Sequence, residues 1–255
     1  MQLHKFLFTL MVCSLFFFSC QKEKTGTIEL LFTNTIDEQP VQFNELIYTN
    51  IAGNKYQVDE VRYFISRVFL IDAGRRWIEV KQDDGIHYVD FSIPNTLTWK
   101  ISDMPQRNYT AISFVFGLDS ALNTSNRFVN APECNFAWPE NLGGGYHYMQ
   151  INGFFENKDG NKQSLNIHTG IGQLYENDTI KAFVHNTFIV TLPVKYAINE
   201  DNPVSLTLNM EIQRWFGSPF KPYNFNTFGS EIMKNQKAQQ LLQENGRYVF
   251  SVISD

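Results

Sequence analysis

The sequence predicts a mainly β protein: an antiparallel β-sandwich with Greek-key-like connections, forming a single domain with one C-terminal helix. Two observations predict this class. Short runs rich in β-branched and aromatic residues recur along the chain, and turn signals separate them about every 8 to 15 residues. The composition agrees, because the chain contains 23 phenylalanines and 11 tyrosines, which favour strands.

The N-terminal half predicts five strands. Residues 27–33 and 61–71 are rich in β-branched and aromatic side chains. Residues 75–91 predict two strands that flank Asp83-Asp84-Gly85, a hairpin turn signal. Residues 109–119 predict a buried strand, in which alternate side chains face opposite ways and Gly117 ends the run.

The C-terminal half predicts a second group of strands. Residues 146–157 and 162–170 flank the turn residues 158–161 and predict a hairpin. Residues 187–194 and 205–215 predict two further strands of the sandwich.

One segment near the C-terminus predicts a helix. Ser230 is a favourable N-cap, the apolar residues that follow have a partial 3-to-4 spacing, and Gly246 stands at the C-terminal end. Residues 247–253 then predict a last strand. The sequence shows neither a tandem repeat nor an interior linker, which favours a single folded unit.

The first 20 residues predict a lipoprotein signal. Lys5 gives a positive start, residues 6–18 form an apolar stretch of secretory length, and Ser19 precedes Cys20. We expect residues 1–19 to be the signal peptide, Cys20 to carry the lipid and residues 20–26 to form a tether before the domain at 27–255. The protein would then be an outer-membrane lipoprotein of the cell envelope, facing the periplasm or the cell surface. The alternative is a short membrane anchor that is never cleaved.

The net charge and the cysteine content limit the classes of function and the disulfides that we expect. The full chain has a net charge of −5, and removing residues 1–19 takes away Lys5 and no acid, so the mature chain has −6. A mildly acidic chain without a Lys/Arg cluster argues against nucleic-acid binding. With Cys13 in the signal and Cys20 acylated, Cys134 stands alone, so we expect no intramolecular disulfide.

Four histidines remain beyond the signal: His87, His147, His168 and His185. No HExxH, no CxxC and no helical i,i+4 pair marks a metal site, but in a β-sandwich ligands come from different strands. If their strand ends converge, His87 and His168 would bind a borderline or soft ion such as copper. The alternative is that each is an ordinary hydrogen-bonded histidine.

His147 and Met149 are two residues apart on a predicted strand, so we expect them to share a face. An imidazole and a thioether together suit Cu(I). The alternative for Met149 is packing in the core.

The segment around Trp138 ends in three glycines, residues 143–145, which allow sharp turns or a close approach of the backbone. No lysine and helix follow, so this is not a phosphate loop; the alternative is a flexible connection. The chain also lacks GxSxG and a Ser/His/Asp set. A glycan hydrolase stays open as an alternative, because any two acids could meet in the fold to form its carboxylate pair, but nothing in the sequence points to one. Our leading interpretation is a protein that is not an enzyme.

Six segments, taken together and in order, resemble the MbnP-like copper-binding proteins, which are common as lipoproteins in the Bacteroidota. The resemblance covers about residues 27–253. The segments are VRYFISRVFL (61–70), HYVDF (87–91), YTAISFVFGLDSALNTS (109–125), FAWPENLGGGYHYMQINGFF (136–155), IHTGIG (167–172) and EIMKNQKAQQLLQENGRYVFSV (231–252).

The resemblance implies an extracytoplasmic β domain that binds copper through histidines without catalysis. His87 and His168 stand at the family's histidine positions, with His147 or Met149 as a third ligand and Cu(I) as the expected state. In some members a tryptophan near the site is oxidised to kynurenine by a di-haem partner enzyme, and Trp138 falls in the corresponding stretch. Histidine ligation predicts that affinity falls as the pH drops through about 6.5.

The chain also departs from the family pattern. Asn34 stands where the first strand often has a histidine, and the chain ends in SVISD without the histidine-containing tail. The tryptophan-rich block is reduced to Trp138 alone. The alternative function is therefore a cell-surface interaction or ligand-binding module, with a degenerate metal site and with residues 138–145 as the contact surface.

Overall fold

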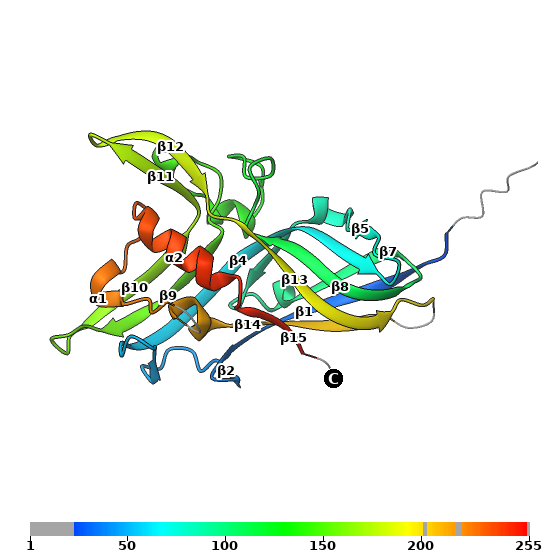
Figure 1. Ribbon diagram of the computed structural model, residues 1–255, viewed down its shortest axis with the longest axis horizontal. Coiled ribbons are helices and arrows are strands. Elements are labelled where there is room, and N and C mark those ends of the chain that lie inside the picture. Colours follow the sequence, from blue (N-terminus) through cyan, green and yellow to red (C-terminus); the bar gives the residue numbers. More distant parts are fainter. Residues whose placement is uncertain (1–22, 201–202, 218–220, 254–255) are drawn as a thin grey trace, which may run out of the picture.

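The computed structural model describes residues 23–200, 203–217 and 221–253 (Figure 1). Two β-sheets form a sandwich, and the structure is mainly β, as the sequence predicts. The proposed signal peptide and Cys20 lie outside the described residues. Over the part of the chain that is described, no helix combines the length and apolar character needed to cross a membrane.

The first sheet has the strand order β15–β14–β1–β2, and β7 also pairs with β1. The strands are β1 (Thr25–Ile36), β2 (Gln39–Pro40), β7 (Thr98–Pro105), β14 (Val204–Glu211) and β15 (Phe250–Ile253). The pairing of β1 with β14 is parallel, which departs from an all-antiparallel sandwich. A parallel pair needs a long connection, and these two strands lie near opposite ends of the chain.

The second sheet has the order β10–β9–β4–β8–β13, and β3, β5 and β6 also pair with β4. The strands are β3 (Tyr48–Thr49), β4 (Lys55–Asp72), β5 (Trp77–Glu79), β6 (His87–Asp90), β8 (Asn108–Phe116), β9 (Met149–Glu156), β10 (Lys162–Thr169) and β13 (Phe188–Ala197).

Strand β4 is the centre of this second sheet. Arg62 pairs with both β6 and β9, and Ile65 pairs with both β6 and β8. Because a strand residue has one neighbour on each side, β6 lies on one side of β4 while β9 and β8 lie on the other. The predicted hairpin of β9 and β10 is confirmed.

The predicted hairpin in residues 75–91 is wrong. β5 and β6 do not pair with each other but lie along the same side of β4. Between them a 3-10 helix covers Gln82–Gly85, in which Asp83 and Asp84 have positive φ values of 52° and 56°. Two adjacent left-handed residues carry the chain from one short strand to the next instead of closing a hairpin.

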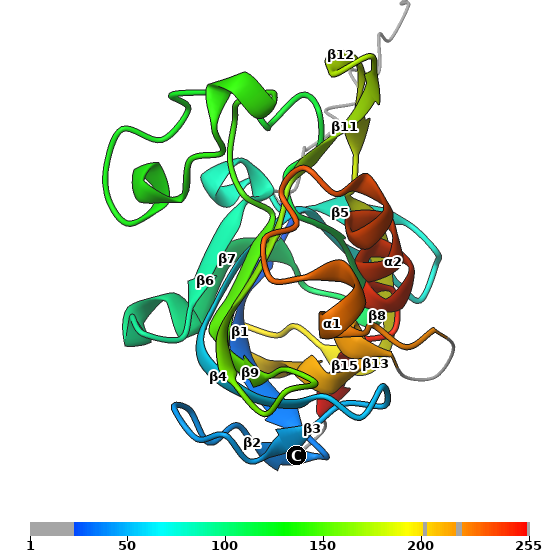
Figure 2. The ribbon, with the colours of Figure 1, turned by 90° about the vertical axis from the view of Figure 1, so that its left-hand side faces the viewer.

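A further hairpin, β11 (Ile171–Glu176) and β12 (Thr179–His185), projects from the body of the molecule (Figures 1 and 2). The long connection between β8 and β9, drawn in green, lies at the same end of the molecule (Figure 2). It carries the two 3-10 helices Glu133–Phe136 and Glu140–Leu142.

The C-terminal segment contains α1 (Phe225–Phe228), α2 (Gln236–Gly246) and β15. The predicted N-cap at Ser230 is wrong, because Asn235 caps α2 by accepting a hydrogen bond from the backbone N–H of Ala238. Ser230 instead accepts a backbone hydrogen bond from Asn166 and lies beside β10. The helix buries Ala238 and Leu242.

Aromatic rings from both sheets fill the space between them. Tyr63 of β4 makes an edge contact with Phe32 of β1, with ring centroids 6.5 Å apart. It makes another with Phe250 of β15 at 5.9 Å. The side chains of β4 that have odd numbers in this region therefore face the core, and their even-numbered neighbours face the outer side of the second sheet.

Candidate functional site

A row of polar side chains crosses the outer face of the second sheet. Asp90 of β6 pairs with Arg62 of β4, Arg62 with Gln150 of β9, and Gln150 with His168 of β10. Residues directly opposite each other in a sheet point to the same face, so His168 shares its face with Arg62. His168 is therefore turned away from the inter-sheet core.

His147 lies against His168 on this outer face. It lies two residues before the start of β9, and its ring centroid is 5.2 Å from that of His168, with the ring planes at 84°. The rings of Phe136 and Trp138 contact the other sides of His147, at centroid distances of 5.1 Å and 4.8 Å. Two imidazoles from different segments thus meet, and two aromatic rings border one of them, His147.

The hydrogen bond of His147 defines which ring nitrogen carries its proton. Nδ1 lies 3.0 Å from the backbone carbonyl oxygen of Phe136. A carbonyl oxygen only accepts, so Nδ1–H is the donor and Nε2 of the neutral ring keeps its lone pair. Nε2 is buried and has no hydrogen-bond partner among the described residues.

A chain of hydrogen bonds defines the proton of His168 in the same way. The side-chain amide of Asn152 donates through Nδ2 to the carboxylate of Glu60 at 2.8 Å. Its Oδ1 therefore faces Nε2 of His168, at 2.7 Å, and accepts that proton. The lone pair of neutral His168 is left on Nδ1. An outer hydrogen-bond partner of this kind orients metal-binding histidines in proteins.

Burial keeps both rings uncharged at neutral pH. Burial lowers the pKa of His147 to about 3, partly offset by the carbonyl of Phe136, and His168 and Arg62 lower it further. Burial lowers the pKa of His168 to about 4, and the positive charge of Arg62 acts in the same direction. A neutral imidazole is the form that binds a metal ion.

Trp138 borders the site through its contact with His147, and its side chain is 1% exposed. Its indole N–H donates to the backbone carbonyl of Leu142 at 3.2 Å. Gly170 follows the end of β10, and a Cβ atom there would lie 2.6 Å from Cε3 of Trp138. The glycine after His168-Thr169 thus lets the indole approach the backbone, which explains why glycine stands there in IHTGIG.

Met149 does not join this cluster. It pairs with Tyr63 and Thr169, is completely buried and packs in the core between the sheets. The expectation that Met149 and His147 share a face is wrong, because regular pairing of β9 begins only at Met149 and the ring of His147 turns to the outer face.

His87 also lies away from the pair of His147 and His168. It pairs with Ile65 and lies three residues from Asp90, so its side chain points to the face opposite that of Arg62 and His168. Strands β4 and β9 separate β6 from β10, which places the two histidine backbones at least about 14 Å apart at about 4.8 Å per strand. The structure therefore does not bring His87 and His168 to one ion.

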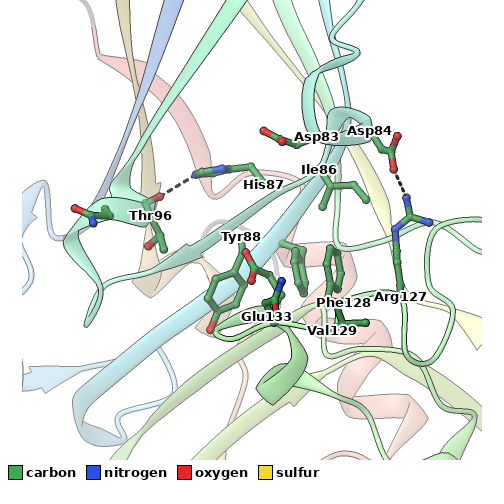
Figure 3. A pocket seen from close by; sticks show the side chains of 13 residues that line it. Asp83, Asp84, Ile86, His87, Tyr88, Thr96, Arg127, Phe128, Val129 and Glu133 are labelled. Atoms are coloured by element: carbon green, nitrogen blue, oxygen red, sulfur yellow. Dashed lines mark hydrogen bonds and ion pairs between the residues drawn. The ribbon is translucent and has the colours of Figure 1, made fainter.

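Aromatic stacking explains the position of the His87 ring. Its ring lies between Phe32 and Trp99, at centroid distances of 5.0 Å and 4.9 Å. Nε2 lies 2.8 Å from the carbonyl oxygen of Thr96, and His87 and Tyr88 point to opposite sides of their strand (Figure 3). His87 borders an open cavity of about 770 Å³, where Arg127 pairs with Asp84 at 2.6 Å.

Among the described residues, no third ligand completes the histidine pair. In the described ranges, three or more His, Cys, Asp or Glu residues never gather as a metal-binding group. Asn34 lies on β1 in the first sheet, opposite Met210, and His185 is exposed at the end of β12. The arrangement offers two nitrogen donors, His147 Nε2 and His168 Nδ1.

Sequence reasoning missed Glu60, Arg62 and Asn152. The turn after β9 carries a signal for Asn152. The backbone of Asn157 bonds to Asn161 across the turn, and this pair fixes the register of the hairpin. In that register Asn152 lies opposite Asn166 and beside His168. No comparable local signal links Arg62 to His168, since β4 and β10 are far apart in the sequence and do not pair directly.

The sequence profile of the MbnP family matches residues 25–235 of the chain. The chain belongs to the MbnP family. Among solved structures, MbnP from Methylosinus trichosporium is similar to this MbnP-family protein, with a TM-score of 0.54 and 18% sequence identity. The similarity covers 76% of this chain and 78% of that one, and at this identity it shows the fold. None of the curated proteins matches the chain.

Proposed function

We propose that this MbnP-family protein is a lipid-anchored, extracytoplasmic copper-binding protein without catalytic activity, and that His147 and His168 hold the ion. The observation that carries the proposal is the meeting of the two rings, with centroids 5.2 Å apart, on the outer face of the second sheet. His87 and Met149 have no part in it, because both side chains face the core.

The residues present fit a metal ion. Nε2 of His147 is buried without a hydrogen-bond partner among the described residues, which costs about 1–3 kcal/mol for a polar atom unless something binds it. Both rings are oriented from behind, His147 by the carbonyl of Phe136 and His168 by Asn152. Low pKa values keep both neutral, so binding requires no proton release from the rings at neutral pH.

The donor set favours copper in its monovalent state. Two imidazoles without carboxylate or thiolate suit copper better than calcium or magnesium, which take oxygen ligands. Cu(I) accepts low coordination numbers, and the described residues offer the two nitrogens and no third ligand of the usual kind. When bound, copper would be held as a soft cation for storage or transfer.

The metal experiment compares the protein with a His147→Ala, His168→Ala double variant after exposure to Cu(I) under reducing conditions. We expect near-stoichiometric copper in the wild type and its loss in the double variant. His185→Ala is the matched control, because His185 is exposed at the end of β12, and it should retain copper. Equal copper in all three proteins would contradict the proposed site.

Lipid anchoring rests on the sequence of residues 1–20, which lie outside the described residues. Cys20→Ala should release the protein from the membrane fraction into the soluble fraction of the cell envelope. Retention of the variant in the membrane would favour the uncleaved anchor instead.

The proposal includes a di-haem oxidase partner that acts on Trp138. Trp138 is the tryptophan in contact with His147, which supports this residue as the modified one. Mass spectrometry of the peptide that carries Trp138, from protein isolated out of its native cell envelope, should give the mass of kynurenine. Unmodified tryptophan there would contradict the partner.

One observation favours the second candidate, an interaction module on the same scaffold. The projecting β11–β12 hairpin exposes three large apolar side chains: Leu174 at 49%, Tyr175 at 43% and Phe183 at 48%. The buried Trp138 is not part of such a surface, so the contact would be made by the hairpin rather than by residues 138–145. Absence of copper from the wild type would leave this candidate.

A further inference from the structure

Arg62 carries a positive charge on the same face of the second sheet as His168. It lies two strands from His168 in the row that crosses the outer face of the second sheet, with Gln150 between them. Its guanidinium carbon lies 5.8 Å from the centre of the Phe136 ring, and the same ring contacts His147. The guanidinium and the imidazole of His147 therefore contact the same ring.

Two carboxylates lie near Arg62, and one of them, Glu60, also accepts the hydrogen bond from Asn152 that leads to His168, so Glu60 offsets part of the charge of Arg62 at the site. Nη2 donates to Glu60 at 2.8 Å, but the side chain of Glu60 is 45% exposed, so water screens this ion pair. Nε is buried without a hydrogen-bond partner among the described residues. Asp90, the residue opposite Arg62 on β6, accepts hydrogen bonds from Tyr88 and Ser92.

The guanidinium of Arg62 carries a permanent positive charge, which repels any other cation near it. Arg62 shares the outer face with His168 and contacts the same Phe136 ring as His147, so a cation bound by the two histidines meets this repulsion. A divalent ion meets it twice over.

We propose that Arg62 makes the His147–His168 site selective for monovalent over divalent metal ions. This inference rests on the proposed copper function and adds to it a residue that determines specificity without binding the metal. Two strand spacings of about 4.8 Å separate Arg62 from His168. A unit charge about 10 Å away, at an effective dielectric constant of about 20, changes the affinity for each additional positive charge roughly tenfold.

The test uses the full chain and measures the affinity for Cu(I) and for Cu(II) separately, by competition with a chelator specific for each state. Arg62→Gln removes the charge, and Arg62→Lys is the matched control that keeps it. Arg62→Met is a second neutral variant that retains the apolar stem over Phe136. Thermal unfolding of each variant establishes that it is folded.

We expect Arg62→Gln and Arg62→Met to bind Cu(I) about tenfold and Cu(II) about a hundredfold more tightly, so the ratio of the two affinities changes about tenfold. Arg62→Lys should keep the wild-type ratio. Unchanged ratios in both neutral variants, or an equal change in Arg62→Lys, would overturn the inference while leaving the copper site intact. Failure of the wild type to bind copper would instead contradict the proposed function.

Discussion

The ring of His87 lies parallel to the indole of Trp99, with centroids 4.9 Å apart and planes at 6°. Phe32 covers the other face at 5.0 Å, so the imidazole is the central ring of a stack that joins β6 to the first sheet. Burial lowers the pKa of His87 from 6.5 to about 4, although the carbonyl of Thr96 acts in the opposite direction. His87 therefore stabilises the packing of the two sheets and does not belong to the site of His147 and His168.

This stack predicts that acid destabilises the protein between about pH 6.5 and pH 4. Below pH 6.5 the unfolded chain binds a proton at His87 and the folded chain does not, until its own pKa near 4 is reached. Each proton taken up only on unfolding lowers the unfolding free energy by about 1.4 kcal/mol per pH unit. Melting temperatures measured in this window should fall less steeply in His87→Phe, which keeps the stack. Identical slopes would contradict the assignment.

Copper retention should persist to a lower pH than the sequence indicated. An ordinary histidine would release the ion as the pH falls through about 6.5. Because the pKa values of His147 and His168 are lowered to about 3 and about 4, protons compete with the metal only as the pH approaches 4. Dialysis of loaded protein at pH 7, 5.5 and 4 should show copper lost in the last step. Loss already at pH 5.5 would contradict the buried, neutral pair.

Asn152→Ala should weaken copper binding while the fold is retained. The substitution removes the acceptor of the His168 Nε2 proton and its link to Glu60. Loss of such an outer partner lowers metal affinity roughly 10- to 100-fold. Asn166→Ala is the control, because Asn166 lies directly opposite Asn152 in the ladder but outside this chain of hydrogen bonds. A similar effect of both variants would point to a general loosening of the hairpin.

Gly170→Ala should displace Trp138. The added methyl group would lie 2.6 Å from the indole, and overpacking of this kind costs about 1–3 kcal/mol of unfolding free energy. We expect a lower melting temperature and a red-shifted tryptophan emission as the indole becomes exposed. Gly74→Ala is the control, since its nearest neighbour is a side-chain oxygen of Asp72 at 3.2 Å. An unchanged spectrum in Gly170→Ala would show that the indole does not depend on this close approach.

Glu211→Ala should destabilise the end of the parallel pair β1–β14. Its buried carboxylate accepts hydrogen bonds from the hydroxyl of Thr35 at 2.7 Å and from the backbone N–H of Asp37 at 3.0 Å. Hydrogen bonds to a charged group contribute about 1.5–3 kcal/mol each, so chemical denaturation should show a loss of a few kcal/mol. Thr35→Val removes one of these bonds to Glu211, together with the hydrogen bond that Thr35 accepts from Asn209, and leaves the charged carboxylate in place, so it should cause a smaller loss. Equal losses would indicate that the carboxylate acts through Thr35 only.

Local pattern was sufficient for most strands and for the hairpin of β9 and β10. A strand is predicted from the alternation of a few consecutive side chains, and a turn from a few consecutive turn residues. The pairing of two strands that are adjacent in the sequence needs only a short loop between them. The hairpin predicted in residues 75–91 failed because β5 and β6 each pair with the distant β4. No local signal in residues 75–91 shows that a distant strand pairs with each of these two strands instead.

The candidate site shows the same division. The sequence determined which side chains with metal-binding chemistry exist, the strands that carry most of them, and the family to which the chain belongs. The tertiary structure decided which of them meet: it joined His147 to His168, turned Met149 into the core and set His87 between two aromatic rings. The physical reason is that a shift of one residue along a strand reverses the face of a side chain, and the order of the strands in the sheet fixes its neighbours; both follow from pairings across long stretches of chain.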